Sequence, residues 1–242
     1  MGQKFVVNDG AGAAAAAAPA ATRPDWPSAA QAVIQAGKHA AERGWVPATS
    51  GNFSVRSTQG QVAITRSGVD KGALNLADIL RQPIGEALLP GSSAEAVLHL
   101  RLYAEHDNIG AVFHVHHLAA SVLGRVYVNQ GAIVLEGWEL QKALAGVATH
   151  EAQISLPVFA NTQNVSALAD QVARQFAQAP AGSLLAPGYV IAGHGLYTWG
   201  TDAQQAWRHL EALDALLTLV LTWRQTLSPS HNIQPQLRSF HP

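Results

Sequence analysis

The chain has 242 residues, of which 48% are hydrophobic and only 13% are charged, and 15 lysines and arginines against 16 acidic residues leave a formal net charge of -1. This balance excludes the basic surface that recruits nucleic acid, and the length suits one large α/β domain. Because the chain has no cysteine, disulfides, thiol nucleophiles and cysteine-bound metals are excluded. Any metal must be held by carboxylates or by some of the 11 histidines.

Residues 1–27 are rich in alanine and proline and have no apolar periodicity, so we expect a flexible N-terminal arm before a single domain over residues 28–242. A Gly10-x-Gly12-x-x-Ala15 match to a dinucleotide-binding turn lies in this arm, but Asp25, the acid at the right distance, lies among prolines where no strand can present it. The start does not resemble a secretory signal, and the apolar runs are too short to span a membrane. We therefore expect a cytoplasmic protein with no membrane partner.

From Ser28 onwards, regular patterns predict mixed helices and strands. The expected helices cover residues 28–43, 93–106, a short stretch after 117, 139–144, 165–177, and a long final segment that opens with a Thr201-x-x-Gln204 capping box. The expected strands cover residues 52–56, 61–65, 111–116, 132–135, 154–159, 189–191 and 196–199. Because strict βαβ alternation is lacking, we expect an α/β fold whose central sheet is largely antiparallel and is covered by helices in three αβα layers.

Two histidines follow an apolar strand in Gly110–His117. Residues two apart in a strand project from one face, so His114 and His116 can aim two imidazoles at one point, while His117 faces the other way. His194 lies between two glycines where two strands meet, and it could supply a third ligand. Three histidines leave a zinc ion one open position, as in catalytic sites. The alternative is that these residues are polar strand residues, core histidines and an ordinary turn.

Polar loops with glycine could bind an anion. Thr49–Asn52 precedes the first strand of a predicted hairpin, and Thr65–Gly72 follows the second, so both loops can lie at one end of the sheet. Backbone amides, hydroxyls, Asn52 and Lys71 would then surround a phosphate. Ser92 and Ser93 add a helix start where the dipole favours anions. Each loop taken alone could also be an ordinary turn.

Two regions supply candidate proton-transfer carboxylates. Glu136 and Glu139 stand in an apolar stretch, where desolvation would raise a carboxyl pKa toward the useful range. Glu95 lies near a helix start, where the dipole would keep it ionised. The alternative for each is a solvated helix face or a plain cap.

Taken in order, the motifs resemble those of the class II aldolase/adducin family. They read Thr-Ser-Gly-Asn-Phe-Ser at 49–54, Thr-Arg-Ser-Gly at 65–68, Ser-Ala-Glu at 93–95, His-Val-His at 114–116 and Gly-His-Gly-Leu-Tyr-Thr-Trp-Gly at 193–200. The resemblance covers about Ser28 to Trp223 and implies the class II aldolase-like fold. It also implies one zinc ion per subunit on His114, His116 and His194. Phosphate-binding positions of the family fall on Asn52, Ser67, Gly68 and Ser93.

Within the family, Leu135–Gly146 and Thr149–Glu151 resemble members that dehydrate 5-methylthioribulose 1-phosphate to 2,3-diketo-5-methylthiopentyl 1-phosphate in methionine salvage. That resemblance implies a hydro-lyase with Glu139 as the acid/base. In the family's sugar-phosphate aldolases the proton-transfer glutamate falls on Glu95, so a zinc aldolase cleaving a deoxy-sugar phosphate is the first alternative. A metal-free, adducin-like interaction module is the second.

The family's members are commonly homotetramers with active sites near subunit contacts, which implies a homo-oligomer here. The final helix agrees with this expectation, because Leu213 to Leu221 are apolar around much of its circumference. Deep burial inside one subunit is the alternative explanation.

Overall fold

The computed structural model describes residues 23–227, so the expected arm at residues 1–22 and the last residues, 228–242, lie outside the described part of the chain. None of the described helices is long and apolar enough to cross a bilayer.

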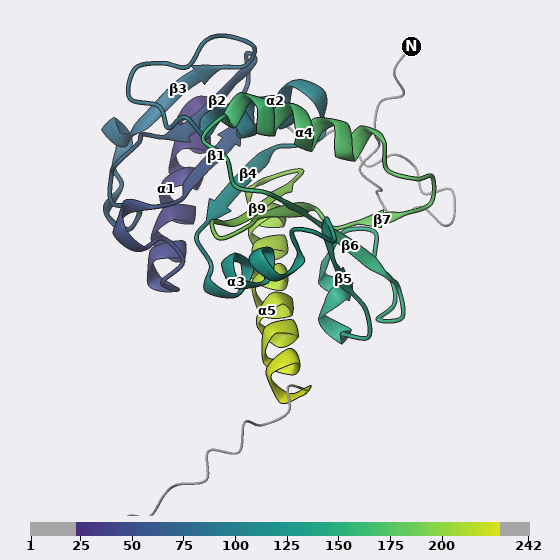
Figure 1. Ribbon diagram of the computed structural model, residues 1–242. Helices are drawn as coiled ribbons and strands as arrows, with labels where there is room; N and C mark the ends of the chain where they lie inside the picture. Colours follow the sequence, from purple (N-terminus) through teal and green to yellow (C-terminus); the bar gives the residue numbers. More distant parts are fainter. Residues whose placement is uncertain (1–22, 228–242) are drawn as a thin grey trace, which may run out of the picture.

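The described residues form a nine-stranded sheet (Figure 1). Its order is β3-β2-β1-β4-β9-β8-β6-β5, with β7 paired to β6. The strands are β1 (Asn52–Arg56), β2 (Gln61–Thr65), β3 (Ile79–Pro83), β4 (Ala111–Val115), β5 (Ala132–Leu135), β6 (Ile154–Phe159), β7 (Leu184–Leu185), β8 (Gly188–Ile191) and β9 (Gly195–Gly200). Among the described strands, the only parallel pairs are those of β6 with β7 and of β6 with β8. The largely antiparallel sheet predicted from the sequence is confirmed.

The helices cover both faces of this sheet. They are α1 (Trp26–Glu42), α2 (Ala96–Glu105), α3 (Leu118–Tyr127), α4 (Val165–Ala177) and α5 (Ala203–Leu227), with short 3-10 turns at Pro47–Thr49, Lys71–Ala73, Leu76–Asp78 and Glu139–Ala143. One apolar core joins the sheet to α1, α3 and α5, and a second joins it to α2 and α4. The two helical layers lie on opposite sides of the sheet in Figure 1. The three-layer αβα arrangement is therefore confirmed.

Side-chain alternation along the strands separates the two cores. In β4, Val112 faces the core under α2 and α4, whereas the next residue, Phe113, faces the core under α1, α3 and α5. The same alternation separates Val62 and Ile64 from Ala63 in β2. This period of two is the geometry of strands that are buried on both faces of the sheet.

Several element boundaries differ from the sequence predictions. Helix α1 begins at Trp26 rather than Ser28, because the Asp25 side chain caps it by accepting from Ser28 N at 3.0 Å. Residues 139–144 form a 3-10 turn rather than an α-helix. Strands β3 and β7 were not predicted; β3 ends in Pro83 at the edge of the sheet, and β7 has only two residues.

The start of α5 also differs from the prediction. Asp202, not Thr201, accepts from the backbone of the first turn, at Gln205 N and 2.8 Å. The Gln205 side chain in turn accepts from Thr201 N at 2.8 Å, so the capping pair lies one residue later than Thr201 and Gln204. Further along, Leu213, Leu216, Leu217 and Val220 are buried inside the subunit, while Leu219 and Trp223 are exposed.

Candidate active site

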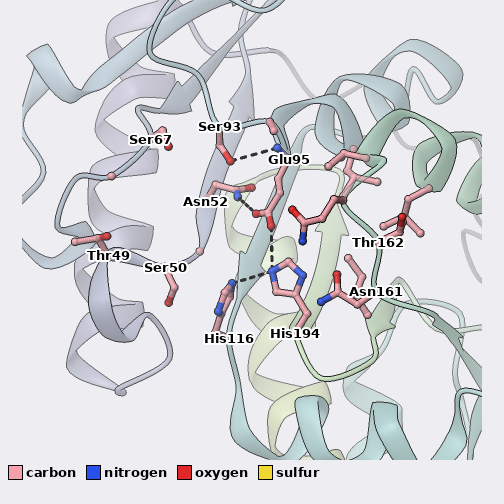
Figure 2. A pocket seen from close by; sticks show the side chains of 18 of the residues that line it. Thr49, Ser50, Asn52, Ser67, Ser93, Glu95, His116, Asn161, Thr162 and His194 are labelled. Atoms are coloured by element: carbon pink, nitrogen blue, oxygen red, sulfur yellow. Dashed lines mark hydrogen bonds and ion pairs between the residues drawn. The ribbon is translucent and has the colours of Figure 1, made fainter.

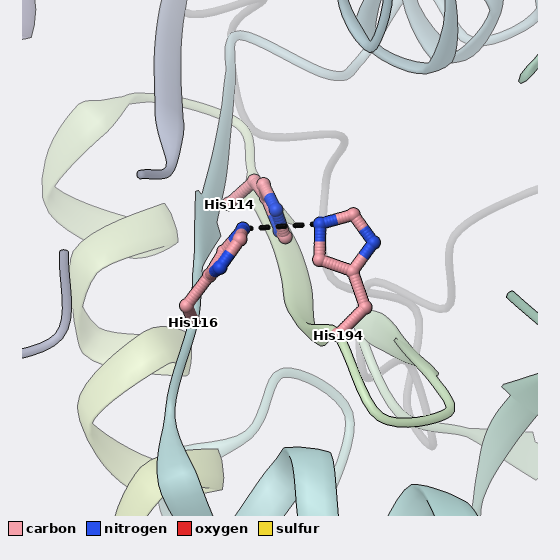
Figure 3. Close-up of side chains that lie close together, drawn as sticks. All are labelled: His114, His116 and His194. Atoms are coloured by element: carbon pink, nitrogen blue, oxygen red, sulfur yellow. Dashed lines mark hydrogen bonds between the residues drawn. The ribbon is translucent and has the colours of Figure 1, made fainter. Parts of the chain in front are cut away.

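Three histidines from two parts of the chain meet at one point (Figure 3). His114 lies in β4, His116 directly follows that strand, and His194 lies in the turn between β8 and β9. One ring nitrogen from each of the three lies within 4.8 Å of the others. The convergence predicted from the two motifs is confirmed, and the cluster could hold a metal ion.

Glycine makes the turn at His194 possible. Gly193 has a φ of +67°, which favours glycine, and a Cβ added to Gly195 would lie 2.1 Å from the Val115 carbonyl oxygen. Strand β9 can therefore run close to the end of β4, with Leu196 paired to Val115. This close approach brings His194 beside His114 and His116.

The protonation of His114 and His116 suits metal binding. His114 is completely buried, its Nδ1 lies 3.1 Å from the Leu196 carbonyl oxygen, and its Nε2 has no hydrogen-bond partner among residues 23–227. A proton on Nδ1 leaves the Nε2 lone pair free for a ligand bond. Burial lowers the pKa of His114 well below its ordinary value, and burial also lowers the pKa of His116. Neutral imidazoles with convergent lone pairs fit a divalent metal.

Glu95 lies against this cluster (Figure 2). One carboxylate oxygen lies 3.0 Å from His194 Nε2, and the other lies 3.6 Å from His114 Nε2. Asn52 Nδ2 donates to the carboxylate at 2.7 Å. Burial raises the pKa of Glu95, but the hydrogen bonds and charges of His194, His114 and Asn52 outweigh burial and lower it to about 2. The expectation that Glu95 is ionised is confirmed, although its neighbours rather than the helix dipole account for it.

His117 lies apart from the cluster, as the strand geometry predicted. Its Nε2 forms an ion pair with Asp214 of α5 at 2.7 Å, and its Nδ1 accepts from Ala120 N at 3.4 Å. His117 therefore caps α3 and ties it to α5.

A cavity of about 420 Å³ opens in front of His116, His194 and Glu95 (Figure 2). The predicted phosphate-binding residues all line it: Asn52, Ser67, Gly68, Lys71 and Ser93. They come from the start of β1, the segment after β2 and the approach to α2. The three candidate anion loops thus meet in one place.

Lys71 is held more tightly than the sequence suggested. It is buried, and its Nζ donates to the carbonyl oxygens of Thr49 and Val69, both at 2.8 Å. Burial lowers its pKa. Lys71 therefore braces two of the loops that surround the cavity.

Arg66 was missed as a candidate residue, although the Thr-Arg-Ser-Gly motif contains it. It lines the cavity beside Ser67, and its guanidinium makes no hydrogen bond or ion pair within the described part of the chain. A guanidinium in this position can bind a phosphate in a bidentate manner, with two parallel hydrogen bonds.

The far side of the cavity was also missed. It is formed by Asn161, Thr162 and Gln163 after β6, and by four apolar side chains: Leu98, Val165, Leu168 and Ile191. The polar Asn-Thr-Gln-Asn run between a strand and a helix was the available signal. It gave no indication that this loop lies opposite the three candidate anion loops, because that depends on the packing of α4 against α2.

Glu139 does not lie in this cavity. Its side chain is 71% exposed, forms an ion pair with Lys142 and lies 3.5 Å from His150 Nδ1. Hydrogen bonding to Lys142 lowers its pKa, so the raised pKa expected from its apolar neighbours is wrong for this structure. Those neighbours do not cover it, because Leu135 turns into the core and Leu140 is partly exposed. Glu136 is likewise exposed and accepts from Gln153 Nε2 at 3.1 Å.

Residues 31–221 match the class II aldolase and adducin N-terminal domain, and the chain belongs to this family. Among curated proteins it is 56% identical to methylthioribulose-1-phosphate dehydratase from Bradyrhizobium sp. over 83% of this chain and 94% of that protein. It is 46% identical to the dehydratase of the same name from Parvibaculum lavamentivorans, over 82% of this chain and 96% of that protein.

Solved structures share the fold. L-fuculose-1-phosphate aldolase from Thermus thermophilus superposes with a TM-score of 0.65 at 25% identity, covering 81% of this chain and 96% of that one. Another L-fuculose 1-phosphate aldolase gives a TM-score of 0.66 at 22% identity, covering 86% and 92%. The class II aldolase-like fold expected from the motifs is confirmed.

Proposed function

We propose that this chain removes water from 5-methylthioribulose 1-phosphate to give 2,3-diketo-5-methylthiopentyl 1-phosphate, as a lyase of methionine salvage. The observation that carries the proposal is the 56% identity to a dehydratase of this name across nearly the whole of both proteins. The cavity supports it, because the candidate anion loops and histidines of a cluster that could hold a metal ion line it together. A phosphorylated sugar does not diffuse through membranes, which agrees with the proposed cytoplasmic location.

The metal we propose is zinc, one per subunit, held by His114, His116 and His194. Three imidazole nitrogens without a fourth protein ligand are typical of catalytic zinc. When bound, the metal supplies a Lewis acid that polarises a substrate oxygen. Within the described residues, Glu95 lies close enough to two of these histidines to orient them.

The phosphate group is proposed to bind between Ser67, Gly68, Ser93 and Asn52. Hydroxyls and backbone amides donate to phosphate oxygens, and Arg66 adds the positive charge at the exposed side. Lys71 contributes mainly through the loops that it holds together. Asn52 also holds Glu95, so it links the phosphate end of the cavity to the reacting end.

The reaction requires a group that moves one proton. Removal of the proton on C3 leaves an electron pair that forms the C2–C3 double bond. Departure of the C4 hydroxyl, with a returned proton, releases water and leaves an enol at C3–C4. Protonation at C4, with loss of the proton from the C3 hydroxyl, then gives the diketone. One carboxylate can serve as base and then as acid in this sequence.

We assign that carboxylate to Glu139 of a neighbouring subunit in a homotetramer. Glu139 is exposed and outside the cavity of its own subunit, whereas the oxygens of Glu95 are engaged by His194 and Asn52. An exposed acid is available to a second copy of the chain. The exposed Leu219 and Trp223 of α5 agree with further subunit contacts. Placed in the cavity of another subunit, Glu139 would lose water and gain the raised pKa that an acid/base needs.

An aldolase is the second candidate, because Glu95 lies in the cavity and the solved neighbours include fuculose-1-phosphate aldolases. A metal-free interaction module is less well supported, since all three histidines are present and converge. The test is to supply purified protein with 5-methylthioribulose 1-phosphate and, separately, with L-fuculose 1-phosphate. The proposal expects rapid loss of the first substrate and negligible turnover of the second, and the reverse result would favour the aldolase.

A further inference from the structure

The cavity has three distinct regions (Figure 2). The phosphate loops, with Thr49, Ser50 and Ser67, lie on one side. His116, His194 and Glu95 lie in the middle. Asn161, Thr162 and the start of α4 lie on the side opposite the phosphate loops. A five-carbon substrate with its phosphate on C1 and its reacting carbons beside Glu95 must therefore direct C5 toward α4.

Beside the polar residues Asn161, Thr162 and Gln163, the side of the cavity that meets C5 has an apolar surface. Leu98, Leu168 and Ile191 belong to the core between the sheet, α2 and α4, and each presents an edge to the cavity. Leu98 lies one helical turn after Glu95, and both residues line the cavity. Val165 packs against the same core and is half-buried. We call these four side chains the apolar wall.

The start of α4 holds Val165 in place. Val165 is the first residue of the helix, and Asn164 caps it by accepting from Ala167 N at 3.0 Å. Thr162 Oγ1 accepts from Asn164 N at 3.1 Å, so part of the polar loop bonds to itself. Val165 is thus presented to the cavity by a capped helix end.

We infer that the apolar wall binds the methylthio group of the substrate and that Val165 determines the preference for a thioether over a hydroxyl at C5. The inference rests on the proposed function. A thioether is apolar and polarisable, so leaving water costs it little free energy of hydration, and it gains dispersion contacts with aliphatic side chains. A hydroxyl at the same place loses its hydrogen bonds to water, and the four aliphatic side chains give it no new partner.

Val165 is the best position for a test because the other three side chains are almost fully buried. Val165→Thr keeps the shape of the side chain and adds a hydroxyl to the wall. Val165→Ala removes two methyl groups and enlarges the space. Val134→Thr, at an exposed position of β5 that does not line the cavity, is the matched control.

The measurement is kcat/KM for 5-methylthioribulose 1-phosphate relative to ribulose 1-phosphate, which carries a hydroxyl in place of the methylthio group. We expect Val165→Thr to lower this ratio by about tenfold, which is the scale at which enzymes discriminate small apolar groups. Val134→Thr should leave the ratio unchanged. Val165→Ala should raise the relative activity toward the bulkier 5-ethylthio analogue.

An unchanged ratio in Val165→Thr, together with no gain for the ethylthio analogue in Val165→Ala, would overturn the inference while the proposed function stands. If Val165→Thr fails to fold, the result for Val165→Ala decides. If the wild type turns over neither sugar phosphate, both the proposed function and the inference are wrong.

Discussion

The Tyr197 ring stacks on the His114 imidazole, with 4.0 Å between ring centroids and 14° between the planes. The two residues face each other in the pairing of β9 with β4. Tyr189 stacks behind Tyr197 with 4.8 Å between centroids, so the imidazole rests on a column of two buried rings. The stack fixes the plane of the His114 ring. The Leu196 carbonyl oxygen holds the imidazole proton on Nδ1.

Replacement of Tyr197 should therefore weaken metal binding. We expect Tyr197→Leu to lower metal affinity by about tenfold, a loss typical when groups that orient a metal ligand are removed. Tyr197→Phe keeps the stacked ring and should bind metal nearly as well as the wild type. Competition with a chromophoric chelator measures both affinities. Equal affinity in Tyr197→Leu and the wild type would show that the stack does not orient His114.

The histidine cluster predicts a clear difference in metal content. His114→Ala and His194→Ala should each lose zinc and activity, because two imidazoles cannot hold the ion firmly. His117→Ala should retain zinc but melt at a lower temperature, since it loses the ion pair with Asp214 and a helix cap. Elemental analysis of the purified variants decides this. Full zinc occupancy in His194→Ala would remove that residue from the ligand set.

Variants of the proposed phosphate-binding residues should change mainly the KM for the substrate. Ser67→Ala removes one hydroxyl donor from the cavity, and a phosphate bound equally in ground and transition states contributes uniform binding. We therefore expect a several-fold rise in KM with little change in kcat. Asn52→Ala should raise KM and also lower kcat, because Asn52 holds Glu95. Initial-rate kinetics provide the measurement, with the exposed Ser166→Ala of α4 as control. Unchanged KM in both cavity variants would place the phosphate elsewhere.

Local patterns in the sequence predicted most of the fold. The turn residues between β1 and β2 and the helical period of α4 predicted the observed residue ranges. A short turn sets the ends of both strands that it joins, and α4 buries one face in a regular repeat. The same reasoning brought His114, His116 and His194 together, since strand geometry and two glycines determine where the rings point.

The rest of the site depends on contacts between distant segments. The apolar stretch around Glu139 suggested a buried carboxyl, but the 3-10 turn directs that side chain outwards to Lys142. Arg66 lies in the Thr-Arg-Ser-Gly motif, from which only Ser67 and Gly68 were predicted to bind phosphate. Val165 looked like an ordinary helix residue, and only the packing of α4 beside α2 brings it to the cavity.

Glu139→Gln should keep zinc and substrate binding but lower turnover by about a hundredfold or more, the usual scale for a general acid/base. Glu95→Gln should lower turnover less than Glu139→Gln does, because an amide can still form hydrogen bonds with Asn52 and His194. The matched control is Glu136→Gln, which lies in the same exposed segment and should be near the wild type. Near-normal turnover in Glu139→Gln, with loss in Glu95→Gln, would assign the proton transfer to Glu95.

The position of Glu139 in another subunit can be tested by subunit mixing. Glu139→Gln and His194→Ala are each expected to be inactive, but co-expressed mixed oligomers should regain activity. In such an oligomer, an intact histidine cluster can face an intact Glu139 from its neighbour. Co-expression of Glu139→Gln with the double variant Glu139→Gln/His194→Ala is the control and should stay inactive. No recovery in the first mixture would place Glu139 and its zinc in the same subunit.

The most direct test of the dehydratase proposal is mass spectrometry of the products formed from 5-methylthioribulose 1-phosphate by the zinc-loaded wild type. We predict a single product that has lost one water and retains both the phosphate and the methylthio group. An aldolase acting on the same substrate would break the C3–C4 bond and release dihydroxyacetone phosphate with a methylthio aldehyde. Detection of those two fragments in place of the dehydrated product would contradict the account.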